Sequence, residues 1–159
     1  MTVSYDSARI TAEGLARAIT EQGPRFSVFE VSVPDVSTTV PRRVRAPVPD
    51  DAPEFLALAF EEAGRAGRPI VLAFEAAWCG ACQRLKEEVL QHPDVAKVLT
   101  ETQFVTVDLD KWPMLGDWYG VTVVPHVVLV DRDGFIVDRV GEVEGPAAFL
   151  GRLERVVRV

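Results

Sequence analysis

Two cysteines, two histidines and the lack of a long apolar run are the first limits that the sequence sets. The cysteines lie three positions apart, so they cannot form a framework of several structural disulfides. No stretch approaches the roughly 18 consecutive apolar residues of a membrane-spanning helix, and the first residues lack the charged and apolar regions of a signal peptide. We therefore expect a soluble protein, cytoplasmic as the sequence is written, or periplasmic or otherwise extracytoplasmic if it is a mature chain.

The composition is that of an ordinary globular domain with an excess of acidic residues. Of the 159 residues, 48% are hydrophobic and 26% are charged, which suits one domain with a sizeable core plus an extension. The chain is too short for two full domains. The net charge of -7 gives no reason to expect nucleic acid or an anionic membrane surface as a partner.

The first 50 residues differ in pattern from the rest. Apolar residues at helical spacing predict a helix over 7–22, and alternation predicts a strand over 26–33. The range 34–49 holds four prolines, which favours an extended connector. We therefore predict an N-terminal extension of helix, strand and proline-rich connector over 1–50, and one main domain over 51–159.

From residue 51 onward, the pattern predicts the order helix, strand, helix, strand, hairpin and helix. Short apolar runs bounded by turn residues indicate the strands, and apolar residues at helical spacing indicate the helices. The predicted strands cover 70–74, 104–109, 127–130 and 135–140, and the last helix begins at Pro146. A bend is expected at His92-Pro93, because proline disfavours helical backbone in the residue before it. This alternation predicts an α/β fold.

Cys79 and Cys82 follow the first predicted strand and begin the next helix. Unpaired backbone N–H groups and the positive dipole end at a helix start stabilise a thiolate, which is the reactive form of cysteine. We therefore predict that Cys79 is the nucleophile and that Cys82, one turn later, is the resolving thiol. The same spacing is half of a zinc site, but the sequence has no second Cys-x-x-Cys and only His92 and His126 as further ligands.

The segment Trp78-Cys79-Gly80-Ala81-Cys82 after an apolar strand resembles the active site of the thioredoxin family. Val124-Pro125 stands where that family carries a cis-proline facing the dithiol. The intervening residues match thioredoxin in order and spacing at Asp110, Pro113, Tyr119 and Gly120. The resemblance covers about residues 51–157. It implies the thioredoxin fold, a central mixed β-sheet flanked by helices, with Pro125 as part of the active site.

Within the thioredoxin superfamily, three segments are similar to one branch. They are Ala63 to Pro69, Glu88-Val89-Leu90 and Pro93-Asp94-Val95. Ala81 between the cysteines also resembles the Cys-x-Ala-Cys of that branch. The branch includes the C-terminal domain of periplasmic thiol-disulfide interchange proteins.

Two positions depart from the family pattern near the dithiol. Ala73 stands where thioredoxin has a buried aspartate that helps to move the proton of the second cysteine, and Thr106 stands where it has a lysine. Glu75, two residues after Ala73, would point to the same face of an extended strand and lie nearer the sulfurs. Our hypothesis is that Glu75 takes the proton-transfer role for Cys82. The alternative is a solvated carboxylate at the end of the strand.

His126 follows the expected cis-proline, where the resemblance places an imidazole close to the dithiol. A protonated His126 would stabilise the Cys79 thiolate and raise the reduction potential. The alternative is a histidine turned into the sheet and hydrogen-bonded there. The resemblance also implies a substrate groove around Trp78, the Gly80-Ala81 turn and the loop through Val124, with His126 beside it. Trp112 and Trp118 are expected in the core.

These observations predict an enzyme, a protein-disulfide oxidoreductase whose redox-active group is the Cys79-Cys82 disulfide, with no further cofactor. Its partners would be a protein substrate disulfide and a redox partner, either a reductase or a membrane electron donor, and the protein would be a monomer. The alternative function is a soft-metal module in which Cys79, Cys82 and His126 bind Cu(I). A non-catalytic adaptor is disfavoured by the intact dithiol.

Overall fold

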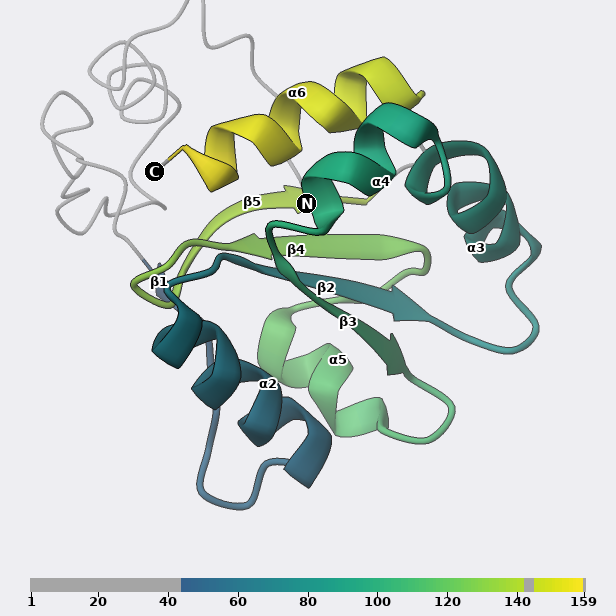
Figure 1. The fold of residues 1–159 in the computed structure, drawn as a ribbon. Coiled ribbons are helices and arrows are strands. Elements are labelled where there is room, and N and C mark those ends of the chain that lie inside the picture. The colour runs from purple at the N-terminus through teal and green to yellow at the C-terminus, as the bar shows by residue number, and fades with distance from the viewer. Residues whose placement is uncertain (1–43, 142–144, 159) are drawn as a thin grey trace, which may run out of the picture. The chain divides into compact units, whose positions relative to one another are not determined.

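A five-stranded mixed β-sheet is the centre of the part of the chain that the structure, a computed structural model, describes: residues 44–141 and 145–158. The strands are β1 (Val44–Arg45), β2 (Ile70–Glu75), β3 (Gln103–Asp108), β4 (His126–Val130) and β5 (Phe135–Val140). Their order is β1-β5-β4-β2-β3 (Figure 1), with β2 and β3 parallel and all other neighbours antiparallel. The helix predicted over 7–22 and the strand predicted over 26–33 lie outside the described residues.

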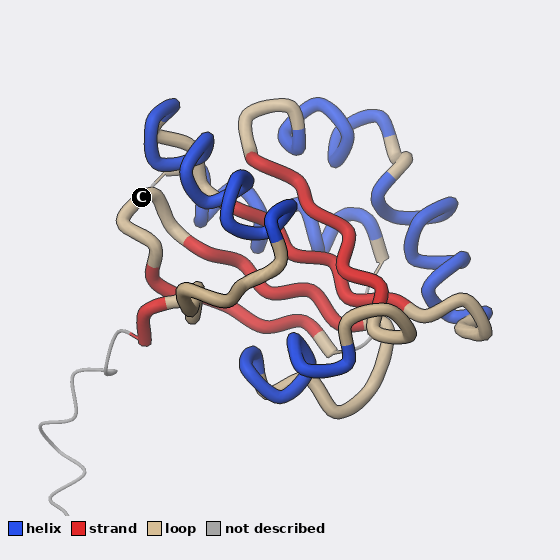
Figure 2. The backbone as a smooth tube through the Cα atoms, turned by 90° about the horizontal axis from the view of Figure 1, so that it is seen from below, coloured by secondary structure: helices blue, strands red, loops and turns tan. Residues whose placement is uncertain are grey.

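Helices cover both faces of the sheet (Figures 1 and 2). One face carries α2 (Glu54–Ala66) and α5 (Pro113–Tyr119); the other carries α3 (Gly80–Arg84), the π-helix η2 (Leu85–Leu90), α4 (Pro93–Leu99) and α6 (Pro146–Val157). The predicted mixed sheet flanked by helices is thus confirmed for the described residues. None of the described helices has the length and hydropathy that a bilayer-crossing segment requires.

The central strand β2 is buried on both faces, as its uninterrupted apolar run indicates. Leu72 and Phe74 belong to the core cluster that contains residues of α2 and α5. Val71 and Ala73 belong to the cluster that contains residues of η2, α4 and α6. Because successive strand residues face opposite sides, the strand register decides which helical layer each side chain meets. The end of β2, where the dithiol follows, is therefore held between two packed layers.

The helical segment after the cysteines is broken where the sequence predicts a bend. His92 is extended, with φ -60° and ψ 133°, and Pro93 is the first residue of α4. The π-helical turn before the break was not predicted. In that turn the Gln91 N–H donates to the carbonyl of Lys86 at 3.1 Å, five residues back, which widens the turn beyond an α-helical one.

Part of the predicted connector packs on the sheet. Val44 and Arg45 pair with β5, and the Ala46 N–H donates to the Gly134 carbonyl at 2.9 Å. The Tyr119 hydroxyl donates to the Pro47 carbonyl at 2.8 Å. The described residues of the predicted connector that precede residue 51 therefore contact the main domain. A two-residue strand within a proline-rich segment carries too little pattern to be recognised in the sequence.

Replacing Tyr119 by phenylalanine tests whether this hydrogen bond holds the connector. We expect the free energy of unfolding at pH 7, measured by urea denaturation, to fall by about 1 kcal/mol, because the bond to Pro47 is lost. Burial raises the pKa of Tyr119, so the unfolded chain loses the phenol proton first as pH rises past about 10. The wild type should therefore lose stability above that pH, and Tyr119→Phe should lose less. An identical decline in both proteins would contradict the assignment.

Candidate active site

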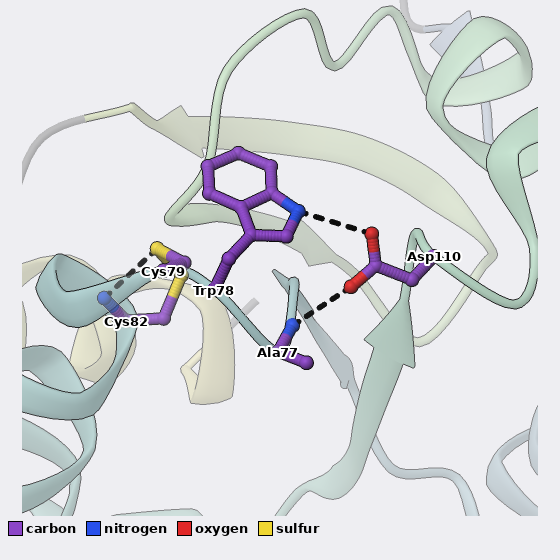
Figure 3. The surroundings of a disulfide bond; sticks show 5 residues. All are labelled: Ala77, Trp78, Cys79, Cys82 and Asp110. Carbon is purple, nitrogen blue, oxygen red and sulfur yellow. Dashed lines mark hydrogen bonds between the residues drawn. A yellow bond between two sulfur atoms is a disulfide. The ribbon is translucent and has the colours of Figure 1, made fainter.

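The two cysteines form a disulfide at the first turn of α3 (Figure 3). Cys79 is the N-cap residue with extended backbone, and its sulfur accepts a hydrogen bond from the Cys82 N–H at 3.1 Å. The Cys79 N–H in turn donates to the carbonyl of Ala76 at 3.1 Å. The cysteines are 8% and 6% exposed. The first sulfur therefore lies where the N–H groups of the helix start point, which is the arrangement that stabilises a thiolate after reduction.

Asp110 fastens the loop that precedes the dithiol (Figure 3). One carboxylate oxygen accepts the Ala77 N–H at 2.9 Å, and the other accepts the indole N–H of Trp78 at 3.1 Å. Nothing in the sequence predicted this role of Asp110 beyond its place in the family pattern. Its position two residues after the end of β3 is the feature that could have indicated this role, because the carboxyl ends of the parallel strands β2 and β3 meet at the same edge of the sheet.

The tryptophans differ in exposure. Trp78 is 76% exposed although its indole N–H is bonded, so its ring is available at the surface beside the disulfide. Trp118 packs against the core as expected. Trp112 was also expected in the core, but it is 36% exposed and its ring lies 5.8 Å from that of Phe55.

Pro125 and the residue before it lie beside the cysteines. The Val124-Pro125 peptide is cis, as the resemblance implied. Val124 packs against the small cluster of Ala76, Cys79 and Cys82, and Pro125 lines a cavity together with Cys82. The loop before β4 therefore contacts the surroundings of the dithiol through the apolar side chains of Val124 and Pro125.

A cavity of about 200 Å³ lies beside Cys82, between the end of β2, the strand β3 and η2. This cavity is lined by Ala73 and Thr106, the two uncharged residues that depart from the family pattern. They are direct neighbours in the sheet. Glu75 lines it as well, and also lines a second cavity of about 300 Å³ that includes both cysteines. The structure thus brings Glu75 to the Cys82 side of the site.

His126 is placed differently from the other predicted site residues. It pairs in the sheet with Phe74, so its side chain lies on the face of α2 and α5, and it lines neither cavity beside Cys82. Among the described residues neither ring nitrogen has a hydrogen-bond partner. Burial, with a smaller effect from the positive charge of Arg139, lowers the pKa of His126. A neutral imidazole supplies no positive charge to a Cys79 thiolate.

The position of His126 also bears on the metal alternative. Within the described ranges, no three His, Cys, Asp or Glu side chains are grouped so that they could hold a metal ion. The space beside the imidazole is provided by Gly141, where an added Cβ would lie 3.4 Å from the His126 Nδ1. The imidazole ring therefore packs over Gly141, directly after β5, and does not form a group of metal ligands with the two cysteines.

His126→Asn tests this placement through the pH dependence of stability. Because the pKa of His126 is lowered in the folded protein, the unfolded chain takes up the proton first as pH falls below about 6.5. The stability that comes from the neutral ring is present above that pH and is lost below it. Urea denaturation between pH 7 and pH 5 should show a steeper loss for the wild type than for His126→Asn. An NMR titration of His126 at or above pH 6.5 would refute the prediction.

Comparison with known proteins agrees with this geometry. Residues 56–156 match the family model of the thioredoxin-like domain. The chain is 36% identical over 78 residues to the thioredoxin-like protein HCF164, chloroplastic, from Arabidopsis thaliana, a match that covers 49% of this chain and 30% of the relative. The chain thus spans less than a third of that relative's length.

Two solved structures share the fold. A thioredoxin from Thermus thermophilus has a TM-score of 0.57 and 27% identity, over 63% of this chain and 82% of the other. The oxidised C-terminal domain of DsbD from Neisseria meningitidis also has a TM-score of 0.57, with 24% identity over 64% of this chain and 93% of the other. The DsbD likeness shows the fold alone.

Proposed function

The chain belongs to the thioredoxin-like domain family, and from this premise we propose that it is a thiol-disulfide oxidoreductase that acts on protein disulfides through Cys79 and Cys82. The observation that carries the proposal is the pair of cysteines bonded to each other at the first turn of α3, with the Cys79 sulfur accepting the Cys82 N–H. This arrangement favours a thiolate on the residue that attacks first.

The proposed reaction has two exchanges. The Cys79 thiolate attacks one sulfur of a substrate disulfide, which forms a mixed disulfide and releases the other substrate sulfur as a thiolate. The Cys82 thiolate then attacks the Cys79 sulfur, which restores the Cys79-Cys82 disulfide and releases the second substrate thiolate. Two electrons pass from the dithiol to the substrate. A redox partner, either a reductase or a membrane electron donor, returns two electrons to the protein.

The substrate groove in this proposal is the surface around the disulfide. Trp78 is the most exposed large apolar side chain beside it, and Gly80 is also exposed. Ala81 and Val124 are half-buried and pack against the cysteines. His126 lines neither cavity beside Cys82, and its place in this groove stays a prediction. Pro125 lines the cavity beside Cys82, where it would limit the approach of water.

The protein needs no cofactor besides its disulfide for the two exchanges above, and it would act as a monomer on a disulfide of another protein. Cytoplasmic localisation stays a prediction, because the Arabidopsis relative is named as a chloroplast protein.

Insulin reduction by dithiothreitol tests the proposed activity. The wild type should accelerate precipitation of the insulin B chain over dithiothreitol alone, Cys79→Ser should abolish the acceleration, and Cys82→Ser should accumulate a mixed disulfide that mass spectrometry detects. A wild type no faster than dithiothreitol alone would contradict the proposal. Tight one-to-one Cu(I) binding by such an inactive protein would instead support the soft-metal alternative.

Glu75→Gln tests the proposed proton acceptor for Cys82. If the Glu75 carboxylate takes that proton, we expect the variant to resolve the mixed disulfide at least about tenfold more slowly at pH 7 and to recover at alkaline pH, where the thiol ionises without a base. Glu88→Gln is the matched control, since Glu88 is exposed on η2 and lines neither cavity beside Cys82. Unchanged pH profiles for Glu75→Gln would show that the carboxylate is merely solvated.

A further inference from the structure

Lys86 lies on the wall that the two cavities beside Cys82 have in common. The cavity of about 200 Å³ and the cavity of about 300 Å³ share four lining residues, namely Glu75, Cys82, Lys86 and Gln91. Lys86 follows Cys82 by four positions, so both side chains project from the same side of the helical segment. No pattern in the sequence marked Lys86 as a site residue.

The π-helical turn explains why Lys86 and Gln91 meet at this wall. The Gln91 N–H donates to the Lys86 carbonyl at 3.1 Å, which closes the wide turn of η2. π-turns inside helices are frequent at functional sites, because they redirect side chains that an α-helix would place elsewhere. Here the turn lies directly after the resolving cysteine.

Lys86 is the one cation among the described residues that line these two cavities. On the β2 side of the smaller cavity, the titratable lining residue is Glu75. The lining residues from β3 are Phe104 and Thr106, and the one from the loop before β4 is Pro125; none of these three is titratable. From η2 the second charged group is Glu87, which lines only the larger cavity.

The two charged groups on η2 differ in their partners. The Glu87 carboxylate accepts a hydrogen bond from the Gln83 amide at 3.2 Å. Lys86 makes no ion pair with any residue in the described part of the chain. Its ammonium group is therefore available to respond to a charge that forms on Cys82 or Glu75.

We propose that Lys86 is a positioning residue for the second exchange, in which its ammonium group stabilises the Cys82 thiolate. The proposal rests on the function proposed above. Lys86 and Glu75 are the two charged residues that line both cavities, whereas Ala73 and Thr106 carry no charge. A cation near a thiolate at the wall of a cavity changes its ionisation by roughly three- to tenfold.

Stopped-flow release of thionitrobenzoate from DTNB separates the two exchanges, when reduced protein is in excess over DTNB. The first release reports attack by Cys79, and the second reports resolution by Cys82. For Lys86→Gln we expect the second release at pH 7 to be slowed about threefold, with the first release unchanged. The difference should vanish at alkaline pH, where Cys82 is ionised in both proteins, and Lys86→Arg should restore the wild-type rate.

Arg84→Gln is the matched control. It removes one positive charge from the same helical segment, but Arg84 is exposed and lines neither cavity. An equal effect of Arg84→Gln and Lys86→Gln on the second release, or no effect of either, would overturn the role of Lys86 while the proposed function stands. A wild type that fails to release the second thionitrobenzoate would overturn the proposed function itself, and the role of Lys86 with it.

Discussion

The hydrogen bond from the Cys82 N–H to the Cys79 sulfur is the interaction around which the site is arranged. It requires that Cys79 leave the strand in extended backbone and that the helix begin at Gly80, so that the free N–H groups of the first turn point at the first sulfur. The same geometry brings the two sulfurs into bonding range. The first turn of α3 therefore positions both the attacking cysteine, Cys79, and the resolving cysteine, Cys82.

The rest of the fold holds this structure in place. β2 is buried on both faces, which fixes the direction in which the chain enters the loop before Cys79. Asp110 then bonds both the backbone of Ala77 and the indole of Trp78, so the end of β3 restrains that loop from the other side. Val124 completes the surroundings with an apolar contact. Among the described residues, the charged side chains that line the cavities beside Cys82 are Glu75, Lys86 and Glu87.

Much of the site was predictable because it is marked by short sequence motifs at characteristic spacings. The cysteine spacing and the apolar run of β2 could each be read without knowledge of the fold, whereas the Val124-Pro125 pair was implied by the resemblance to the thioredoxin family. The break at His92-Pro93 follows from proline geometry alone. These features depend on a few neighbouring residues, so the chain's tertiary structure leaves them unchanged.

The features that were missed depend on tertiary pairing. The side chain of His126 faces α2 and α5 because the residue pairs with Phe74, and a shift of one position would reverse its direction. β1 exists only because β5 offers an edge next to the connector. No amino-acid pattern in the sequence distinguishes the π-helical turn that places Lys86 on the cavity wall. The hydrogen-bond partner of Asp110 comes from the loop after another strand, β2.

The most direct test of this account is the pKa of the Cys79 thiol in the reduced protein, measured from the pH dependence of iodoacetamide alkylation with the modified residue identified by mass spectrometry. The account predicts that Cys79 is alkylated first and with a pKa below the free-cysteine value of about 8.5, because the helix start stabilises its thiolate. A Cys79 pKa at or above about 8.5, or preferential alkylation of Cys82, would contradict it.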